Sequence, residues 1–252
     1  MPAPRALILA AGRGERLRPL TDTCPKPLID VGGKPLIAWH LEALAAAGVR
    51  EVVINTAWLE AQFPSALGDG SRWGLSIRWS MEQRDHGGAL ETAGGIAKAL
   101  PHLVQPGLDS FWVVSGDVFV PGFAFSADAA QRFAADTATL AHLWLVPNAP
   151  HHPHGDFGLD DARDLATDAA PRMTWASVGL FRAAMFDGVA ADRPMKLRPL
   201  FDAALAAGRL GAQAWHGRWI DVGNAERLAQ ARAAAASASA SASASASASA
   251  SA

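Results

Sequence analysis

An apolar run that ends at two glycines stands near the start of the chain. Residues from Arg5 to Ala11 are continuously apolar after the arginine, and Gly12-Arg13-Gly14 follows at once. A short apolar run without alternation is typical of a parallel strand that is buried on both faces. The run therefore predicts a strand of a parallel sheet that leads directly into a glycine-containing loop.

Expected strands and helices alternate through the first half of the chain. Helices are expected where apolar residues recur every three to four positions, as between Pro35 and Gly48, and strands where short apolar runs stand between turns. The expected strands are 5–11, 51–55, 75–80 and 111–115, and the expected helices are 35–48, 59–67 and 92–100. This order predicts an α/β fold with a doubly wound, mostly parallel Rossmann-like sheet.

The pattern is looser after Asp117. It predicts helices at 127–135 and 198–207, strands at 139–146, 173–175, 178–181 and 212–215, a segment at 219–222, and a last helix from Asn224. We expect one domain over residues 1–232, with a core of roughly 1–122 and 212–232 and a smaller lid over the sheet of roughly 123–211. Residues 233–252 contain the strict Ser-Ala repeat and no large apolar group, so we expect a low-complexity tail without order.

Composition favours small-molecule partners. The 22 Lys and Arg residues are balanced by 24 Asp and Glu residues, which argues against nucleic acid or an anionic membrane as a partner. No apolar run is long enough to span a bilayer. The lone Cys24 and the lack of a leader before the first strand favour a reducing cytoplasm.

The loop after the first strand has the residue types of a phosphate site. Two glycines let backbone N–H groups approach a polyphosphate, and Arg16 and Lys26 can neutralise its charge. A dinucleotide fingerprint would need glycine at Leu17, and a P-loop would need Gly-Lys-Ser/Thr after its second glycine, so both alternatives fail. The remaining alternative is that the glycines only turn the chain.

Two aspartates could hold a hard cation at the same edge of the sheet. Asp117 follows an apolar strand, and Asp221 stands beside another apolar segment. Taken singly, either could instead be a cap or turn residue. The histidines at 151, 152 and 154 lack metal-site spacing, so a solvated loop is expected there.

The segment Leu7–Leu28 resembles a known signature. Its G-x-G-x-R, Arg-Pro-Leu-Thr and Pro-Lys-Pro-Leu elements are similar to those of sugar-1-phosphate nucleotidyltransferases, and the resemblance extends from Arg5 to about Leu228. The strings NTAWL, LGDGSRWGLSIRWS, HGDFGL and WIDVG resemble the N-acetylmuramate 1-phosphate uridylyltransferase branch. The resemblance implies Mg²⁺-dependent transfer of a uridylyl group from UTP to a sugar 1-phosphate, with release of pyrophosphate.

The same resemblance implies roles for individual residues. It makes Arg16 and Lys26 catalytic, and it makes Asp117 and Asp221 the metal pair. The implied nucleotide-binding residues lie in the first glycine loop and around the second glycine-rich stretch: Ala11, Gly12, Arg13, Gly14, Glu15, Glu82, Gly87 and Gly88. The implied sugar-phosphate residues are Glu91, Asn148, Asp156 and Lys196.

Two alternative functions remain open from the sequence. A sibling enzyme acting on glucose or mannose 1-phosphate with another nucleotide would share the implied phosphate and metal residues. A non-catalytic nucleotide-sugar-binding regulatory protein could use the same fold, since fold alone does not confer function. Retention of Arg16, Lys26, Asp117 and Asp221 argues against the regulatory alternative.

Overall fold

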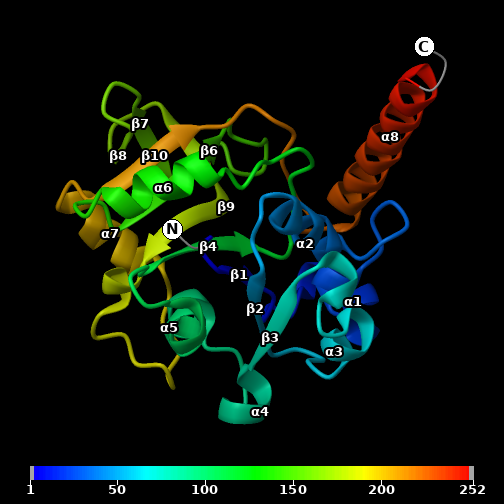
Figure 1. Cartoon of the computed structure of the whole chain (residues 1–252), viewed down its shortest axis with the longest axis horizontal. Helices are drawn as coiled ribbons and strands as arrows, with labels where there is room; N and C mark the ends of the chain where they lie inside the picture. Colours follow the sequence, from blue (N-terminus) through cyan, green and yellow to red (C-terminus); the bar gives the residue numbers. More distant parts are fainter. Residues whose placement is uncertain (1–2, 250–252) are drawn as a thin grey trace.

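The first half of the chain forms four parallel strands of the central sheet. A computed structural model describes residues 3–249, with side chains up to residue 237. The parallel strands are β1 (Ala6–Leu9), β2 (Glu51–Thr56), β3 (Ser76–Met81) and β4 (Ser110–Ser115), in the order β3-β2-β1-β4. The crossovers contain α2 (Leu36–Ala46), α3 (Gln62–Leu67) and α5 (Glu91–Leu103). The predicted doubly wound sheet is confirmed (Figure 1).

The second half extends this sheet. β6 (Ala141–Val146), β7 (Phe157–Asp160), β8 (Leu165–Thr167), β9 (Arg172–Arg182) and β10 (Leu210–Ala214) complete the order β3-β2-β1-β4-β9-β6-β10-β8-β7. β9 is antiparallel to both β4 and β6. The segment 123–211, which we expected over the sheet as a lid, therefore supplies strands that continue the sheet sideways.

β9 is one strand where the sequence predicted two. Its residues 178–182 pair with residues 110–114 of β4, and the pairing with β6 shifts register between Leu143 and Leu145. Ser177 has φ +59, in the left-handed region, at this irregularity. A β-bulge thus interrupts the alternation at the point where the sequence pattern breaks, without ending the strand.

Helices cover both faces of the sheet. α2, α3 and α6 (Ala127–Ala135) pack on one face, and α5 and α7 (Arg198–Ala206) pack on the other. Trp112 of β4 anchors the first core, with ring centroids 5.2 Å from Phe125 and 5.0 Å from Trp144. The short helices α1 (Leu20–Thr23) and α4 (Glu82–His86) lie in the loops after β1 and β3.

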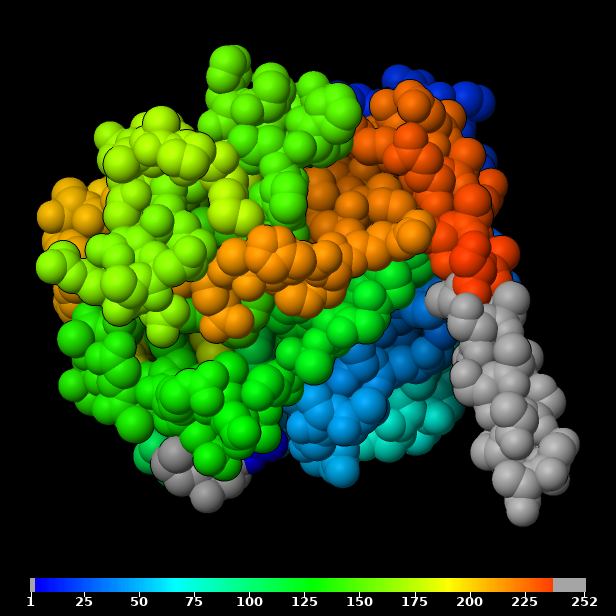
Figure 2. Space-filling view, turned by 90° about the horizontal axis from the view of Figure 1, so that it is seen from above, coloured from blue at the N-terminus to red at the C-terminus, as the bar shows by residue number. Residues whose placement is uncertain are grey.

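A separate two-stranded ribbon lies beyond the end of β4. β5 (Val118–Phe119) pairs antiparallel with β11 (Ile220–Asp221), in register Val118 to Asp221. The segment between β10 and α8 crosses the surface of the molecule (orange in Figure 2), and Trp219 Nε1 on it donates to Ala176 O at 3.0 Å. This return path brings the end of the chain beside the loop after β4.

α8 runs from Ala225 to Ser249. Its first turns carry Leu228, Ala231, Ala234 and Ala235, which are buried in a third core cluster together with Leu36 of α2. The expectation of an unordered tail from residue 233 is therefore wrong as far as Ser249, while residues 250–252 lie outside the described part. Alanine loses no side-chain entropy in a helix, so the repeat can propagate a helix that packing has already nucleated. No helix of residues 3–249 is long and apolar enough to cross a bilayer.

Candidate active site

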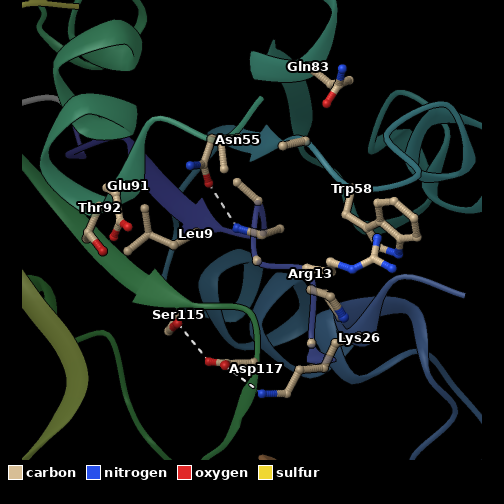
Figure 3. Close-up of a pocket in the computed structure, with 17 residues that line it drawn as sticks. Leu9, Arg13, Lys26, Asn55, Trp58, Gln83, Glu91, Thr92, Ser115 and Asp117 are labelled. Carbon is tan, nitrogen blue, oxygen red and sulfur yellow. Dashed lines mark hydrogen bonds and ion pairs between the residues drawn. The ribbon is translucent and has the colours of Figure 1, made fainter. Parts of the chain in front are cut away.

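A cavity of about 520 Å³ opens at the carboxyl ends of β1, β2 and β4. This is the edge at which open α/β sheets bind ligands. Loops that are far apart in the sequence form its wall, as Figure 3 shows. The lining residues are Leu9, Ala10, Ala11, Gly12, Arg13, Gly14, Lys26, Pro27, Asn55, Ala57, Trp58, Gln83, Ala89, Glu91, Thr92, Ser115 and Asp117.

The loop after β1 forms one side of the cavity. Gly14 has φ +70, and a Cβ there would lie 3.0 Å from Thr21 Cγ2 and 3.2 Å from Lys26 Cβ. Both the left-handed backbone conformation and the lack of space for a side chain therefore favour glycine at this position. A Cβ on Gly12 would meet nothing within 4 Å. Gly14 is thus required by the loop's own packing, while Gly12 leaves the backbone open to a ligand.

The basic residues of this loop point to two places. The Arg13 guanidinium lies 3.7 Å from the Trp58 ring centroid, inside the cavity (Figure 3). Arg16 does not line the cavity, and its Nη2 lies 3.1 Å from where a Cβ on Gly223 would stand. Glu15 is also outside the lining, with a side chain that is 77% exposed. Of the two arginines in the predicted nucleotide loop, Arg13 therefore lies in the cavity wall and Arg16 lies beside Gly223.

Lys26 and Asp117 meet at the cavity wall. Lys26 Nζ donates to Asp117 Oδ2 at 2.8 Å, and the Ser115 hydroxyl donates to Asp117 Oδ1 at 2.8 Å (Figure 3). Burial alone would raise the pKa of Asp117, but the charge and hydrogen bond of Lys26, with the Ser115 hydroxyl, outweigh it and lower the pKa. A buried ammonium and an ionised carboxylate thus stand side by side at the edge of the sheet.

Asp221 of β11 pairs with Val118, the residue after Asp117, and its side chain makes a different set of contacts. Its Oδ2 is 3.2 Å from Arg227 Nη2 and 3.7 Å from His151 Nε2. The Val222 N–H donates to the Asp117 carbonyl at 3.0 Å, so the two backbones are adjacent. His151 is exposed in its loop, as expected, and its ring lies near this carboxylate.

The two aspartates fit part of a magnesium ligand set. Within residues 3–237, no group of three or more His, Cys, Asp or Glu side chains gathers closely enough to hold a metal ion. Mg²⁺ is bound through oxygen ligands and typically takes one or two carboxylates, keeping water and substrate phosphate for the rest. Asp117, in the turn before β5, and Asp221, on β11, have that donor chemistry.

Glu82 is buried beneath the cavity. Its Oε1 accepts from Asn55 Nδ2 at 2.7 Å, and its Oε2 accepts from the Leu90 N–H at 2.7 Å. Burial raises the pKa of this carboxyl. The sequence placed Glu82 against the base, but both of its oxygens are occupied inside the protein, and Gln83 lines the cavity in its place.

The glycine-rich stretch contributes its end to the cavity. Gly87 and Gly88 are outside the lining, whereas Ala89, Glu91 and Thr92 are in it. Glu91 has φ +57, a left-handed conformation that a non-glycine residue adopts at a cost, and such strain clusters at functional sites. Of the residues predicted here, the structure brings only Glu91 to the cavity.

Asn148 and Asp156 stabilise their own loop. Asn148 Nδ2 donates to the Pro153 and Arg172 carbonyls at 3.0 and 2.9 Å, and Asp156 Oδ2 accepts from the Trp175 N–H at 2.8 Å. Lys196 is exposed and outside the cavity lining, next to Met195, whose carbonyl accepts from the first turn of α5. None of these three predicted sugar-phosphate residues lies in the cavity wall.

Sequence reasoning missed several lining residues, and Asn55 is one of them. Asn55 links two sides of the cavity, because its Oδ1 accepts from the Ala10 N–H at 2.9 Å while its amide reaches Glu82. Trp58, Gln83 and Ser115 were also not singled out. Asn55 and Ser115 stand at the ends of predicted buried strands, where a polar residue is a usable signal.

A buried histidine supports the loop that carries Asp117. His40 of α2 is 1% exposed, and its Nε2 lies 2.9 Å from the Val118 carbonyl, so the neutral ring donates there. Burial lowers its pKa to about 4, against the opposing effects of the Val118 hydrogen bond and the Asp117 charge.

We expect this histidine to make folding pH-dependent. Because the folded state binds the proton less tightly than the unfolded chain, stability should be lost as pH falls from about 6.5 towards 4, by about 3 kcal/mol in all. Urea unfolding of the wild type and of His40→Gln at several pH values measures this loss. An equally steep loss in the variant would show that His40 is not its source.

The chain belongs to the nucleotidyl transferase family, whose sequence profile matches residues 5–238. It is 48% identical over 230 residues to the N-acetylmuramate alpha-1-phosphate uridylyltransferase of Neisseria meningitidis serogroup B, covering 90% of this chain and 96% of that protein. It is 32% identical over 249 residues to the protein of the same name from Caulobacter vibrioides, covering 91% and 97%.

The fold also matches solved structures. A Bacillus anthracis protein assigned as a glucose-1-phosphate thymidylyltransferase, crystallised with sucrose, superposes with a TM-score of 0.78 at 20% identity, covering 92% of this chain and 94% of that one. At this identity the likeness establishes the fold alone. Together with the family match, it confirms the resemblance seen in the sequence.

Proposed function

We propose that this nucleotidyltransferase transfers a uridylyl group from UTP to N-acetylmuramate 1-phosphate, giving the UDP-sugar and pyrophosphate. The observation that carries the proposal is the Lys26–Asp117 pair, 2.8 Å apart beside the glycine loop after β1, in a chain with a near full-length uridylyltransferase relative. The reaction would recycle a cell-wall sugar in the cytoplasm. Its partners would be small molecules.

The reaction needs charge neutralisation more than a base. An oxygen of the sugar 1-phosphate attacks the α-phosphorus of UTP, a new P–O bond forms, and the bond to the β-phosphate oxygen breaks with its electrons leaving on pyrophosphate. The nucleophile is already an anion, so no strong base is required. Alignment and electrostatic stabilisation then supply the rate, as in phosphoryl transfer generally.

The chain's own cations fit this task. Lys26 would neutralise the α-phosphate, and Arg16 would steady the leaving pyrophosphate. Arg13, stacked on Trp58 inside the cavity, would bind the triphosphate. Asp117 and Asp221 would hold Mg²⁺, which when bound adds positive charge against the phosphate oxygens.

Metal removal and a substrate panel test the proposal. We expect pyrophosphate release only when UTP, N-acetylmuramate 1-phosphate and Mg²⁺ are all present, and we expect excess EDTA to abolish it. The panel pairs UTP, dTTP, GTP and ATP with N-acetylmuramate, glucose and mannose 1-phosphates. Preference for another pair would identify a sibling activity, and no release with any pair would favour a regulatory nucleotide-sugar-binding protein.

A further inference from the structure

Two arginines from opposite ends of the chain converge on Gly223. A Cβ added to this glycine would lie 1.9 Å from Arg227 Nη2 and 3.1 Å from Arg16 Nη2. Arg16 comes from the loop after β1, and Arg227 from the first turn of α8, where its N–H is capped by Asn224 Oδ1 at 2.9 Å. Glycine at 223 therefore leaves room for the Arg227 guanidinium.

Arg227 is buried with donors that have no acceptor. The residue is 8% exposed, and its Nε and Nη2 have no hydrogen-bond partner among the described residues. Asp221 Oδ2 lies 3.2 Å from Arg227 Nη2 and balances the charge of the guanidinium, but the contact lacks the geometry of a hydrogen bond. Buried guanidinium N–H groups without an acceptor are costly, which points to a ligand that would supply oxygens.

The charges around Arg227 favour an anion. Arg16 and Arg227 carry two positive charges, and the carboxylate beside them is that of Asp221, so one positive charge is left in excess. A guanidinium presents its N–H groups in a planar fork that matches the oxygens of a phosphate. The backbone beside Gly223 is linked to the cavity wall, because the Val222 N–H donates to the carbonyl of Asp117, a lining residue, at 3.0 Å.

We propose that Arg227 is a phosphate-binding residue that acts together with Arg16. The inference rests on the proposed function, because it places a phosphate group of the substrates or products beside Asp221. That group is either part of the pyrophosphate moiety or the phosphate of the sugar 1-phosphate. In this proposal α8 supplies one phosphate-binding residue, Arg227, and the loop after β1 supplies the other, Arg16.

Equilibrium binding tests the role without requiring turnover. Inorganic pyrophosphate and N-acetylmuramate 1-phosphate are titrated separately by calorimetry, with Mg²⁺ present, into the wild type, Arg227→Met and Arg232→Met. Arg232, on the same helix, is the matched control, since its Nε donates to the Asp30 carbonyl at an exposed site. We expect Arg227→Met to weaken binding of at least one anion by about tenfold or more, and the affected anion identifies the phosphate.

Gly223→Ala keeps every charge and tests the same role. Its methyl group must displace the Arg227 guanidinium, so we expect it to weaken the same anion. Wild-type affinity for both anions in a folded Arg227→Met protein would overturn the proposal. If that variant does not fold, wild-type affinity for both anions in a folded Gly223→Ala protein would overturn it instead. The wild type could also release no pyrophosphate with any substrate pair while Arg227→Met still weakens pyrophosphate binding. That result would refute the proposed uridylyl transfer but not the role of Arg227 in binding phosphate.

Discussion

Replacing Lys26 by methionine should reduce turnover by a factor of about 10³ or more while the protein stays folded. The side chain is 8% exposed and its ammonium is bound to Asp117, so methionine keeps the packing volume and removes only the charge. Without that charge, nothing at this position neutralises the α-phosphate during transfer. Asp117 retains its hydrogen bond from Ser115, so the local fold has a remaining anchor.

The measurement is initial-rate pyrophosphate release with saturating UTP and sugar 1-phosphate. Lys34→Met is the matched control, because Lys34 pairs with Glu42 and stacks on Trp39 outside the cavity. We expect the control to keep a wild-type rate. A folded Lys26→Met enzyme within tenfold of the wild type would contradict the role of Lys26.

Gly95→Ala should destabilise the protein by about 2–4 kcal/mol, although alanine is the better helix former. Gly95 is buried within α5, and a Cβ there would lie 2.6 Å from Glu82 Oε1 and 2.7 Å from Asn55 Nδ2. The methyl group must therefore separate a buried hydrogen-bonded pair. Because Asn55 also accepts from the Ala10 N–H, the phosphate loop should loosen with it.

Chemical denaturation measures this loss. Gly88→Ala is the control, since a Cβ at Gly88 meets nothing within 4 Å and the residue has no left-handed φ. We expect Gly88→Ala to change the free energy of unfolding by no more than about 0.5 kcal/mol. Equal stability of Gly95→Ala and the wild type would mean that the Glu82–Asn55 pair contributes little.

Local patterns were enough to predict the parallel half of the fold and the edge at which the cavity lies. The apolar runs before Gly12 and before Asp117 mark strands buried on both faces, and parallel strands present their carboxyl ends on one side. That geometry brings together Lys26 and Asp117, which are 91 residues apart in sequence. The second half depends on the antiparallel pairing of β9 with β4, which no local pattern encodes.

Individual side-chain contacts were harder to predict. Glu82 stands next to a glycine-rich stretch, and only the folded backbone shows that Asn55 and the Leu90 N–H occupy both of its oxygens. Arg227 was missed because one arginine in a helical pattern reads as a solvated residue. Its burial depends on Gly223 and on the return of the chain beside Asp117.

Tracing the α-phosphate of UTP is the most direct test of the central claim that this site transfers a nucleotidyl group. The enzyme is incubated with α-³²P-labelled UTP, N-acetylmuramate 1-phosphate and Mg²⁺, and the products are separated. We predict that the label appears in the UDP-sugar in an amount equal to the pyrophosphate released, and that omission of the sugar 1-phosphate stops both. Label in UMP, with pyrophosphate released whether or not the sugar phosphate is present, would contradict the account.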